Sequence, residues 1–240
     1  MMRVRLSMRR AVLFLALLLL ALILLFPMRI MVGALGLGDA GLSAREARGS
    51  VWSSQLHEAR FGAAALGDVH ARLNFFPLLA GRARVDLSRA GEGADSLRGA
   101  ISVTRHTLGI DDVSVRLPAA AIFAPLPINA IDLSDVSLRF RQGACDRADG
   151  LVRAELQPDA PGLSLPGGLS GNARCDGAKL LLPLQSQSGM ELLALRIDRS
   201  GGYTADFVVR SSDPAMQRTL QASGFAPSAD GLKLSVAGKL

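Results

Sequence analysis

The sequence predicts a mainly β protein, with an N-terminal single transmembrane helix followed by a curved antiparallel β-sheet or sandwich domain with one short helix. Three observations lead to this fold class. Residues 11–28 form an uncharged apolar run, apolar and polar residues alternate from about residue 42 onward, and clusters of Gly, Pro, Asp and Ser recur at hairpin spacing.

The N-terminal apolar run is long enough to cross a membrane. Its roughly 18 residues span about 27 Å as a helix, close to the thickness of a bilayer's hydrocarbon core. Four arginines precede it, at Arg3, Arg5, Arg9 and Arg10. Because arginines resist translocation, we expect residues 1–10 to form a cytoplasmic stub and the chain after Arg29 to lie on the other side.

A cleaved signal peptide has the same order of charges and is the alternative reading of this segment. Its apolar stretch is usually only about 7–15 residues and ends in an A-x-A-like site. Here the stretch is longer and residues 27–31 are a poor cleavage context, although a site nearer Gly36 stays open. We therefore favour an uncleaved signal anchor.

The chain after the anchor divides into a juxtamembrane linker, 29–48, and a β-rich domain, 49–240. Gly36, Gly38 and Gly41 match the dinucleotide-binding pattern G-x-G-x-x-G, but that pattern requires a preceding strand and a following helix. The glycines are better explained as a flexible junction. We expect no cofactor.

The strands of the domain are expected where apolar residues recur at every second position, as on one face of a half-buried sheet. Turns are expected at 90–96, 109–112 and 158–166. The expected strands are 69–75, 82–88, 101–104, 113–117, 136–141, 151–156, 179–184, 192–198, 203–210 and 232–237.

One segment, 212–224, has helical signals instead. Asp213 is a good N-cap, Pro214 occupies the first helical position and Gly224 follows the end. Met216 and Leu220 lie four residues apart on one face. We expect a short helix that covers an edge or one end of the sheet.

The net charge of +6 comes mainly from the membrane-flanking arginines and implies no acidic partner. Without the five arginines at 3, 5, 9, 10 and 29, the 22 remaining basic residues nearly balance the 21 acidic ones. The sequence therefore does not predict nucleic-acid binding.

The two cysteines, Cys145 and Cys175, are expected to form a disulfide if the domain lies in an oxidising compartment. Closing a loop of about 30 residues contributes on the order of 3 kcal/mol. A metal site or two inert thiols are the alternatives, but no histidine follows His106 to complete a metal site.

Residues with catalytic spacing are sparse. The histidines are His57, His70 and His106, and no G-x-S-x-G or H-E-x-x-H motif occurs. Asp111 and Asp112 are expected at a turn, and on a strand they would point to opposite faces. Arg139 and Arg141 share a strand face, where they either hold an anionic group or form solvated intrasheet ion pairs. We predict no catalytic, cofactor-binding or metal residue, and no small-molecule substrate is identified.

The order of several short motifs is similar to that of a known family, the type II secretion system protein N (general secretion pathway protein N) family. The resemblance extends from about residue 40 to the end of the chain and includes the anchor. The motifs are 49–53 (GSVWS), 66–69 (LGDV), 76–81 (FPLLAG), 145–150 (CDRADG), 169–171 (LSG) before Cys175, and 220–225 (LQASGF).

The resemblance implies a single-pass protein of the bacterial inner membrane, with its N-terminus cytoplasmic and most of the chain periplasmic. It implies a non-enzymatic accessory component that supports assembly of the platform exporting folded proteins. Its expected partners are other inner-membrane components and the secretin-linking component. The alternative is an AsmA-like envelope protein that binds lipid in an apolar β groove, because the Leu/Ala-rich strands also resemble that class.

Overall fold

A computed structural model of the chain describes residues 12–18, 21, 42–61, 64–91, 96–158 and 167–240, and everything below concerns these residues. Residues 12–18 are helical. The elements that follow are β1 (Leu42–Ser43), β2 (Glu46–Ser50), β3 (Ser53–Phe61), β4 (Ala64–Leu73), α3 (Phe75–Leu79), β5 (Ala83–Arg89), β6 (Leu97–Val103), β7 (Thr107–Pro118), β8 (Ile128–Arg141), β9 (Ala144–Leu156), β10 (Leu169–Asn172), β11 (Arg174–Asp176), β12 (Lys179–Gln185), β13 (Glu191–Ile197), β14 (Gly202–Val209), α4 (Pro214–Ala222), β15 (Ala226–Ser228) and β16 (Gly231–Lys239).

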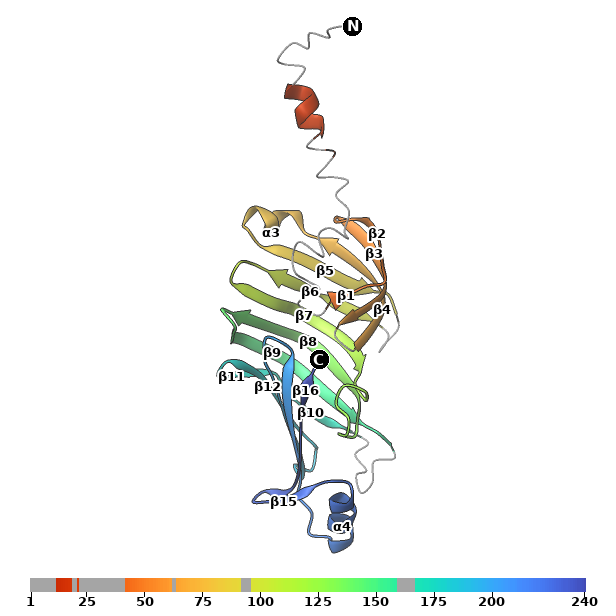
Figure 1. Cartoon of the computed structure of the whole chain (residues 1–240), viewed down its shortest axis with the longest axis vertical. Helices are drawn as coiled ribbons and strands as arrows, with labels where there is room; N and C mark the ends of the chain where they lie inside the picture. The colour runs from red at the N-terminus through yellow and green to blue at the C-terminus, as the bar shows by residue number, and fades with distance from the viewer. Residues whose placement is uncertain (1–11, 19–20, 22–41, 62–63, 92–95, 159–166) are drawn as a thin grey trace.

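The strands form one antiparallel sheet, so the predicted mainly β, antiparallel class is confirmed (Figure 1). Most neighbours in the sheet are also neighbours in sequence, in the order β1-β3-β4-β5-β6-β7-β8-β9-β10-β12-β13-β14-β16-β15. β2 pairs with β3, and β11 pairs with β12. Of the two expected arrangements, the curved single sheet describes the molecule and the two-sheet sandwich does not.

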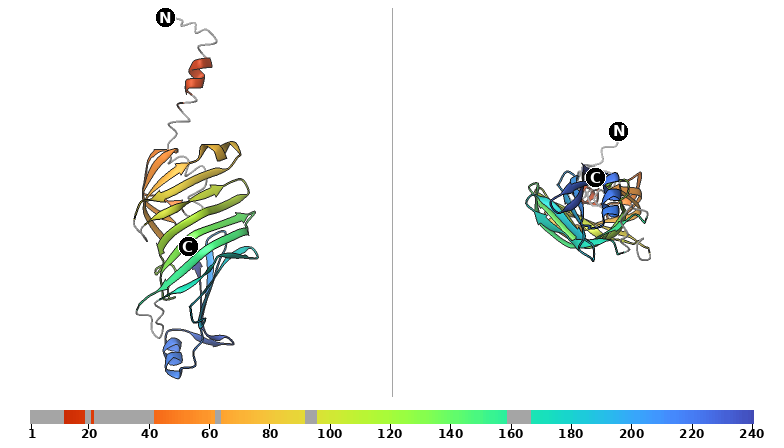
Figure 2. Two further views of the ribbon diagram at one scale, coloured as in Figure 1. Left: turned by 180° about the vertical axis from the view of Figure 1, so that it is seen from behind. Right: turned by 90° about the horizontal axis from the view of Figure 1, so that it is seen from below.

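The sheet coils over its own apolar face. Viewed from behind, the sheet runs from β1–β4 at its upper end, through the broad surface of β5–β9, to the C-terminal strands and α4 at its lower end (Figure 2). One cluster of buried residues, which includes Val85 and Ile101, belongs to the N-terminal half. A second, which includes Phe140 and Val152, belongs to the C-terminal half, and Ile110 packs against both clusters. We call this side the apolar face and the opposite side the polar face.

Long hairpins and bulges give the sheet its shape. The β8–β9 hairpin turns at Gln142 and Gly143, whose φ angles of 51° and 91° suit a two-residue turn that follows the natural strand twist. Bulges interrupt the pairing of β7 with both β6 and β8, and of β8 with β9. Because a bulge bends a strand and increases its twist, these positions help the sheet to curve.

The turn expected at 109–112 is wrong. β7 runs without a break from Thr107 to Pro118, and the preceding hairpin turns near His106. Of the residues that suggested a turn, Gly109 is paired with Arg139, and Asp111 and Asp112 lie in a bulge between Ile110 and Val113. β8 and β9 are also longer than expected, because polar residues in the interior of both strands hide the alternation. The turns expected at 90–96 and 158–166 lie largely outside the described residues.

The expected helix at 212–224 is present as α4, at the lower end of the domain in Figure 1. Asp213 accepts a hydrogen bond from the Ala215 N–H at 2.9 Å, and Leu220 is fully buried against the C-terminal half of the sheet. A second short helix, α3, was not expected. It contains Phe75, which had been assigned to the preceding strand, and Phe76, which is 82% exposed.

Most of the predicted signal anchor, 11–28, lies outside the described residues, as do the stub 1–10 with its arginines and the glycine pattern at 36–41. Among the described residues, no helix has the length and apolar character needed to span a bilayer. The sheet already includes β1 and β2, so the last part of the segment expected as a linker, 29–48, is paired with β3.

Candidate functional site

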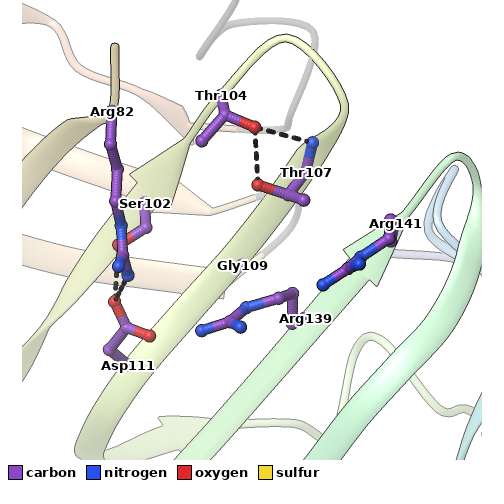
Figure 3. A pocket seen from close by; sticks show the side chains of 8 residues that line it. All are labelled: Arg82, Ser102, Thr104, Thr107, Gly109, Asp111, Arg139 and Arg141. Carbon is purple, nitrogen blue, oxygen red and sulfur yellow. Dashed lines mark hydrogen bonds and ion pairs between the residues drawn. The ribbon is translucent and has the colours of Figure 1, made fainter. Parts of the chain in front are cut away.

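Two adjoining pockets on the polar face are the best-formed hollows of the described residues, and both are small and charged. The first, of about 200 Å³, is lined by Arg82, Ser102, Thr104, Thr107, Gly109, Asp111, Arg139 and Arg141 (Figure 3). The second, of about 170 Å³, is lined by Arg84, Ile110, Asp111, Asp112, Ser137, Leu138, Arg139 and Arg147. Asp111 and Arg139 belong to both. We call the first of these the arginine pocket.

The register of the sheet explains why these residues meet. Arg84 lies opposite Ser102, Ser102 opposite Gly109, Gly109 opposite Arg139, and Arg139 opposite Arg147. Residues in register point to the same side of a sheet. The polar positions of five neighbouring strands therefore form one row across the polar face.

Asp111 is the centre of this cluster. Its Oδ2 atom accepts hydrogen bonds from Arg82 Nη2 at 3.0 Å, Arg84 Nη1 at 2.9 Å and the Ser102 hydroxyl. The side chain is only 17% exposed. Such charge-assisted hydrogen bonds are stronger than neutral ones, so Asp111 ties β5, β6 and β7 together.

The expectation that Asp111 and Asp112 point to opposite faces is wrong, because the bulge of β7 breaks the alternation between them. Both residues line the second pocket. Asp112 has a φ of 51° and accepts a hydrogen bond from the Ser137 hydroxyl at 3.1 Å. Asp111 thus accepts hydrogen bonds from residues of β5 and β6, and Asp112 accepts one from a residue of β8.

Arg139 and Arg141 share a face, as the sequence predicts, and differ in their partners. Their guanidinium groups both extend from β8 toward β7 (Figure 3). Arg141 forms an ion pair with Asp146 at 3.2 Å. The side chain of Arg139 has no hydrogen bond or ion pair within the described part of the chain, although it is only partly exposed. Arg141 therefore fits the intrasheet ion pair, whereas Arg139 is left open to an anion.

Gly109 leaves the space between the side chains of Ser102 and Arg139 empty. A Cβ atom at this position would lie 2.5 Å from the Leu138 carbonyl oxygen. Any side chain would therefore force β7 and β8 apart as well as occupy the floor of the arginine pocket.

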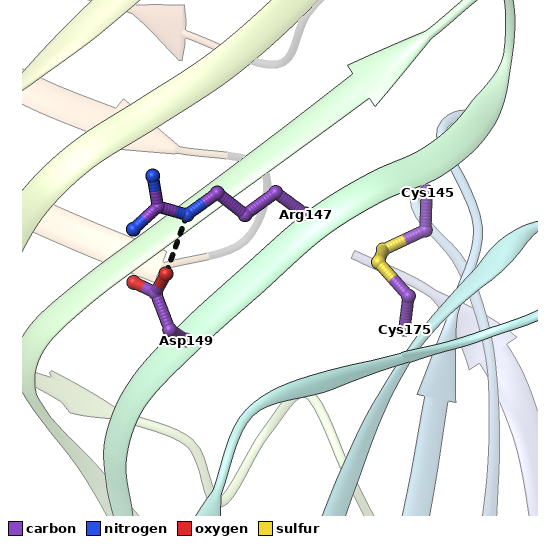
Figure 4. The surroundings of a disulfide bond; sticks show 4 residues. All are labelled: Cys145, Arg147, Asp149 and Cys175. Carbon is purple, nitrogen blue, oxygen red and sulfur yellow. Dashed lines mark hydrogen bonds and ion pairs between the residues drawn. A yellow bond between two sulfur atoms is a disulfide. The ribbon is translucent and has the colours of Figure 1, made fainter.

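A disulfide lies close to the cluster and fixes its outer end. Cys145 and Cys175 are joined, with Cα atoms 5.6 Å apart, and connect β9 to β11 (Figure 4). The Cys145 N–H also donates to the Ala178 carbonyl at 3.0 Å. Arg147, two residues from Cys145, pairs with Asp149 at 2.6 Å. The disulfide thus holds the β8–β9 hairpin that carries Arg141.

None of the three histidines lines either pocket. His57 Nδ1 is 3.3 Å from Asp68 Oδ2, and the Glu58 N–H and His57 together lower the pKa of Asp68. His70 is exposed on β4, as expected for the polar face, and His106 lies in the β6–β7 turn. No cluster of His, Cys, Asp and Glu suited to a metal occurs among the described residues.

The alternative of a lipid groove requires an open apolar trough. On the described part of the chain the apolar face is instead filled by side chains such as Leu193, Leu195 and Phe207, each at most 2% exposed. The hollows lie on the polar face. No observation in the structure favours the groove.

The sequence alone identified only part of the arginine pocket. Arg139 and Arg141 were singled out from their spacing, whereas Arg82, Arg84 and Ser102 were seen only as members of alternating strands. The signal in the sequence was the alternation that places these polar residues on one face of each strand. To see that residues of different strands meet, the pairing register between the strands is also needed, and the sequence did not supply it.

Residues 40–235 match the family model of type II secretion system protein N, and this range covers nearly the whole described sheet. The chain belongs to this family. No curated protein and no solved structure matches it. Membership makes the chain a component of type II secretion with an envelope location, and the family is one of secretion accessory components that is not known to be enzymatic.

Proposed function

We propose that the chain is a non-enzymatic inner-membrane accessory component of the type II secretion system. Its β domain would support assembly of the platform that exports folded proteins, by binding other inner-membrane components or the secretin-linking component. The family match carries this proposal, because it covers the same residues that form the sheet.

The edge of the sheet at β16 supports a role in binding another protein. On one side, β14 pairs with residues Leu232 to Lys239. On the other side, β15 pairs only with residues Gly231 to Lys233. Within the described residues the second half of β16 therefore has one free edge. An extended segment of a partner can add to such an edge through backbone hydrogen bonds.

The proposed membrane arrangement rests on the sequence. Arg3, Arg5, Arg9 and Arg10 precede the apolar run 11–28, which favours a cytoplasmic N-terminus and a periplasmic sheet. A single span would keep the domain at the inner membrane and raise its local concentration near the platform. A reporter enzyme that is active only outside the cytoplasm, fused after Leu240, should be active.

In vivo photocrosslinking tests the binding role. Benzoylphenylalanine introduced at Ser235 or Ala237, both exposed on β16, should crosslink to another secretion component identified by mass spectrometry. His70, exposed on β4 and paired on both sides, with Gln55 and Ser88, is the matched control position. Deletion of the chain should also reduce export of folded proteins. Equal capture from both strands, together with normal export after deletion, would contradict the proposal.

A further inference from the structure

The geometry points to the arginine pocket as a binding site for one acidic side chain of a partner protein, held by Arg139 and Arg141. The inference rests on the proposed function for the partner, which would be another secretion component. The assignment of an anion-binding site depends only on the residues that line the pocket.

The pocket has the size and donors that a carboxylate needs. Its volume of about 200 Å³ is open to the surface and accommodates a single side chain. Arg139 and Arg141 lie two residues apart on one face of β8 and extend toward the same space (Figure 3). Guanidinium groups present forked donors that match a carboxylate in two-point contacts. Gly109, which has no side chain, keeps the space in front of Arg139 clear.

Thr107 supplies a further donor. The Thr104 hydroxyl oxygen accepts hydrogen bonds from the Thr107 N–H at 3.0 Å and from the His106 N–H at 3.3 Å, which uses both of its lone pairs. It must therefore donate its own proton to the Thr107 hydroxyl, 2.7 Å away. The proton of the Thr107 hydroxyl is then free to bind a ligand in the pocket.

The charge of the cluster favours a single negative charge. Arg82 and Arg84 pair with Asp111, Arg84 also pairs with Asp86, and Arg141 pairs with Asp146. Of the three guanidinium groups that line the arginine pocket, only that of Arg139 has no carboxylate partner among the described residues. This one unpaired positive charge matches a carboxylate. A doubly charged phosphate would be repelled more strongly by Asp111, which lies in the wall of the pocket.

The position of the pocket suits a partner that lies across the polar face. It is bordered by the β6–β7 turn, where Arg105 is exposed, and by the β8–β9 hairpin. Both are at the same end of their strands, because the Gln142 N–H donates to the His106 carbonyl at 2.9 Å. A partner resting on these turns would place an acidic side chain directly beside Arg139.

Ligand binding by the full-length chain, purified in detergent with its disulfide intact, tests the site. Propionate, which carries one carboxylate as an acidic side chain does, is the carboxylate probe, and thermal unfolding is followed over a concentration series at constant ionic strength, with inorganic phosphate as the second probe. We expect propionate to stabilise the chain. Arg139→Gln should weaken this effect by about tenfold or more, as expected for a lost charge-assisted contact.

Two further variants make the result specific. Arg98→Gln removes the same charge from an exposed position on the polar face of β6 outside the pocket and should leave propionate binding unchanged. Arg139→Lys keeps the charge without the forked donors and should bind propionate at an intermediate strength. Equal effects of Arg98→Gln and Arg139→Gln would overturn the inference. So would a dependence on Arg139 that appears with phosphate alone, since that would assign the pocket to phosphate groups.

Crosslinking in cells separates this inference from the proposed function. Benzoylphenylalanine at position 105 should capture a secretion component, and Arg139→Gln should abolish the capture while crosslinking from Ser235 persists. Capture that survives Arg139→Gln would overturn the acidic site alone. If no secretion component is captured from either position although propionate binding still requires Arg139, the proposed function fails and the anion site stands.

Discussion

Removing the disulfide between Cys145 and Cys175 should cost a large part of the stability of the β domain. The two cysteines are 30 residues apart in sequence. In the chain-entropy treatment, a crosslink closing a loop of this length restricts the unfolded chain by about 3–4 kcal/mol at 25 °C. The native contacts remain when both residues become serine, so we expect most of this free energy to be lost.

Urea unfolding of the full-length chain measures this cost. The Cys145→Ser/Cys175→Ser double variant should unfold at a lower urea concentration with a similar slope, and the oxidised wild type treated with a reductant should approach the same midpoint. The reduced wild type is the control for effects of the substitutions themselves. A loss below about 1 kcal/mol would refute the reasoning, because the crosslink would then restrict the unfolded chain far less than its loop length predicts.

Three further substitutions, at Gly109, Asp111 and Asp132, are tested by urea unfolding. Gly109→Ala should cost about 1–3 kcal/mol, because its Cβ would lie 2.5 Å from the Leu138 carbonyl oxygen; an unchanged midpoint would show that β7 and β8 separate freely. Asp111→Asn should cost about 1–3 kcal/mol by leaving Arg82 without a carboxylate and Arg84 with Asp86 alone, and stability within error of wild type would argue against a central role for Asp111. Burial and the charge of Glu155 raise the pKa of Asp132, so its ionised form destabilises the fold as the pH rises above about 4. Asp132→Asn should therefore be at least as stable as wild type at pH 7, with an advantage that shrinks at pH 4, and a clear loss at pH 7 would contradict this.

The sequence predicted the fold class well because burial of one face of the sheet makes apolar and polar residues alternate along each strand. Strands 82–88 and 203–210 were placed within a residue or two of β5 and β14. The helix at 212–224 was found because its Asp213 cap and Pro214 are local signals. These features depend on neighbouring residues only.

Features that depend on pairing between strands were missed. Gly109, Asp111 and Asp112 have the composition of a turn, and only the neighbouring strands show that Gly109 is paired within β7 and that the two aspartates lie in a bulge. The arginine pocket was missed for the same reason, since Arg82 and Arg139 are distant in sequence and meet through the register of three strand pairs. The helix α3 was missed because Phe75 continues the alternation of β4, although Pro77 suits the first turn of a helix.

The division of the sheet into an apolar and a polar face limits where a partner can bind. The apolar face is occupied by the two clusters of buried side chains, so a partner must use an edge or the polar face. The β16 edge offers backbone hydrogen bonds, which select little by sequence, whereas the arginine pocket selects a charge at one position. A partner that used both would be held by the edge and oriented by the pocket. Substitutions at the two places should then weaken binding separately, and by more together than either does alone.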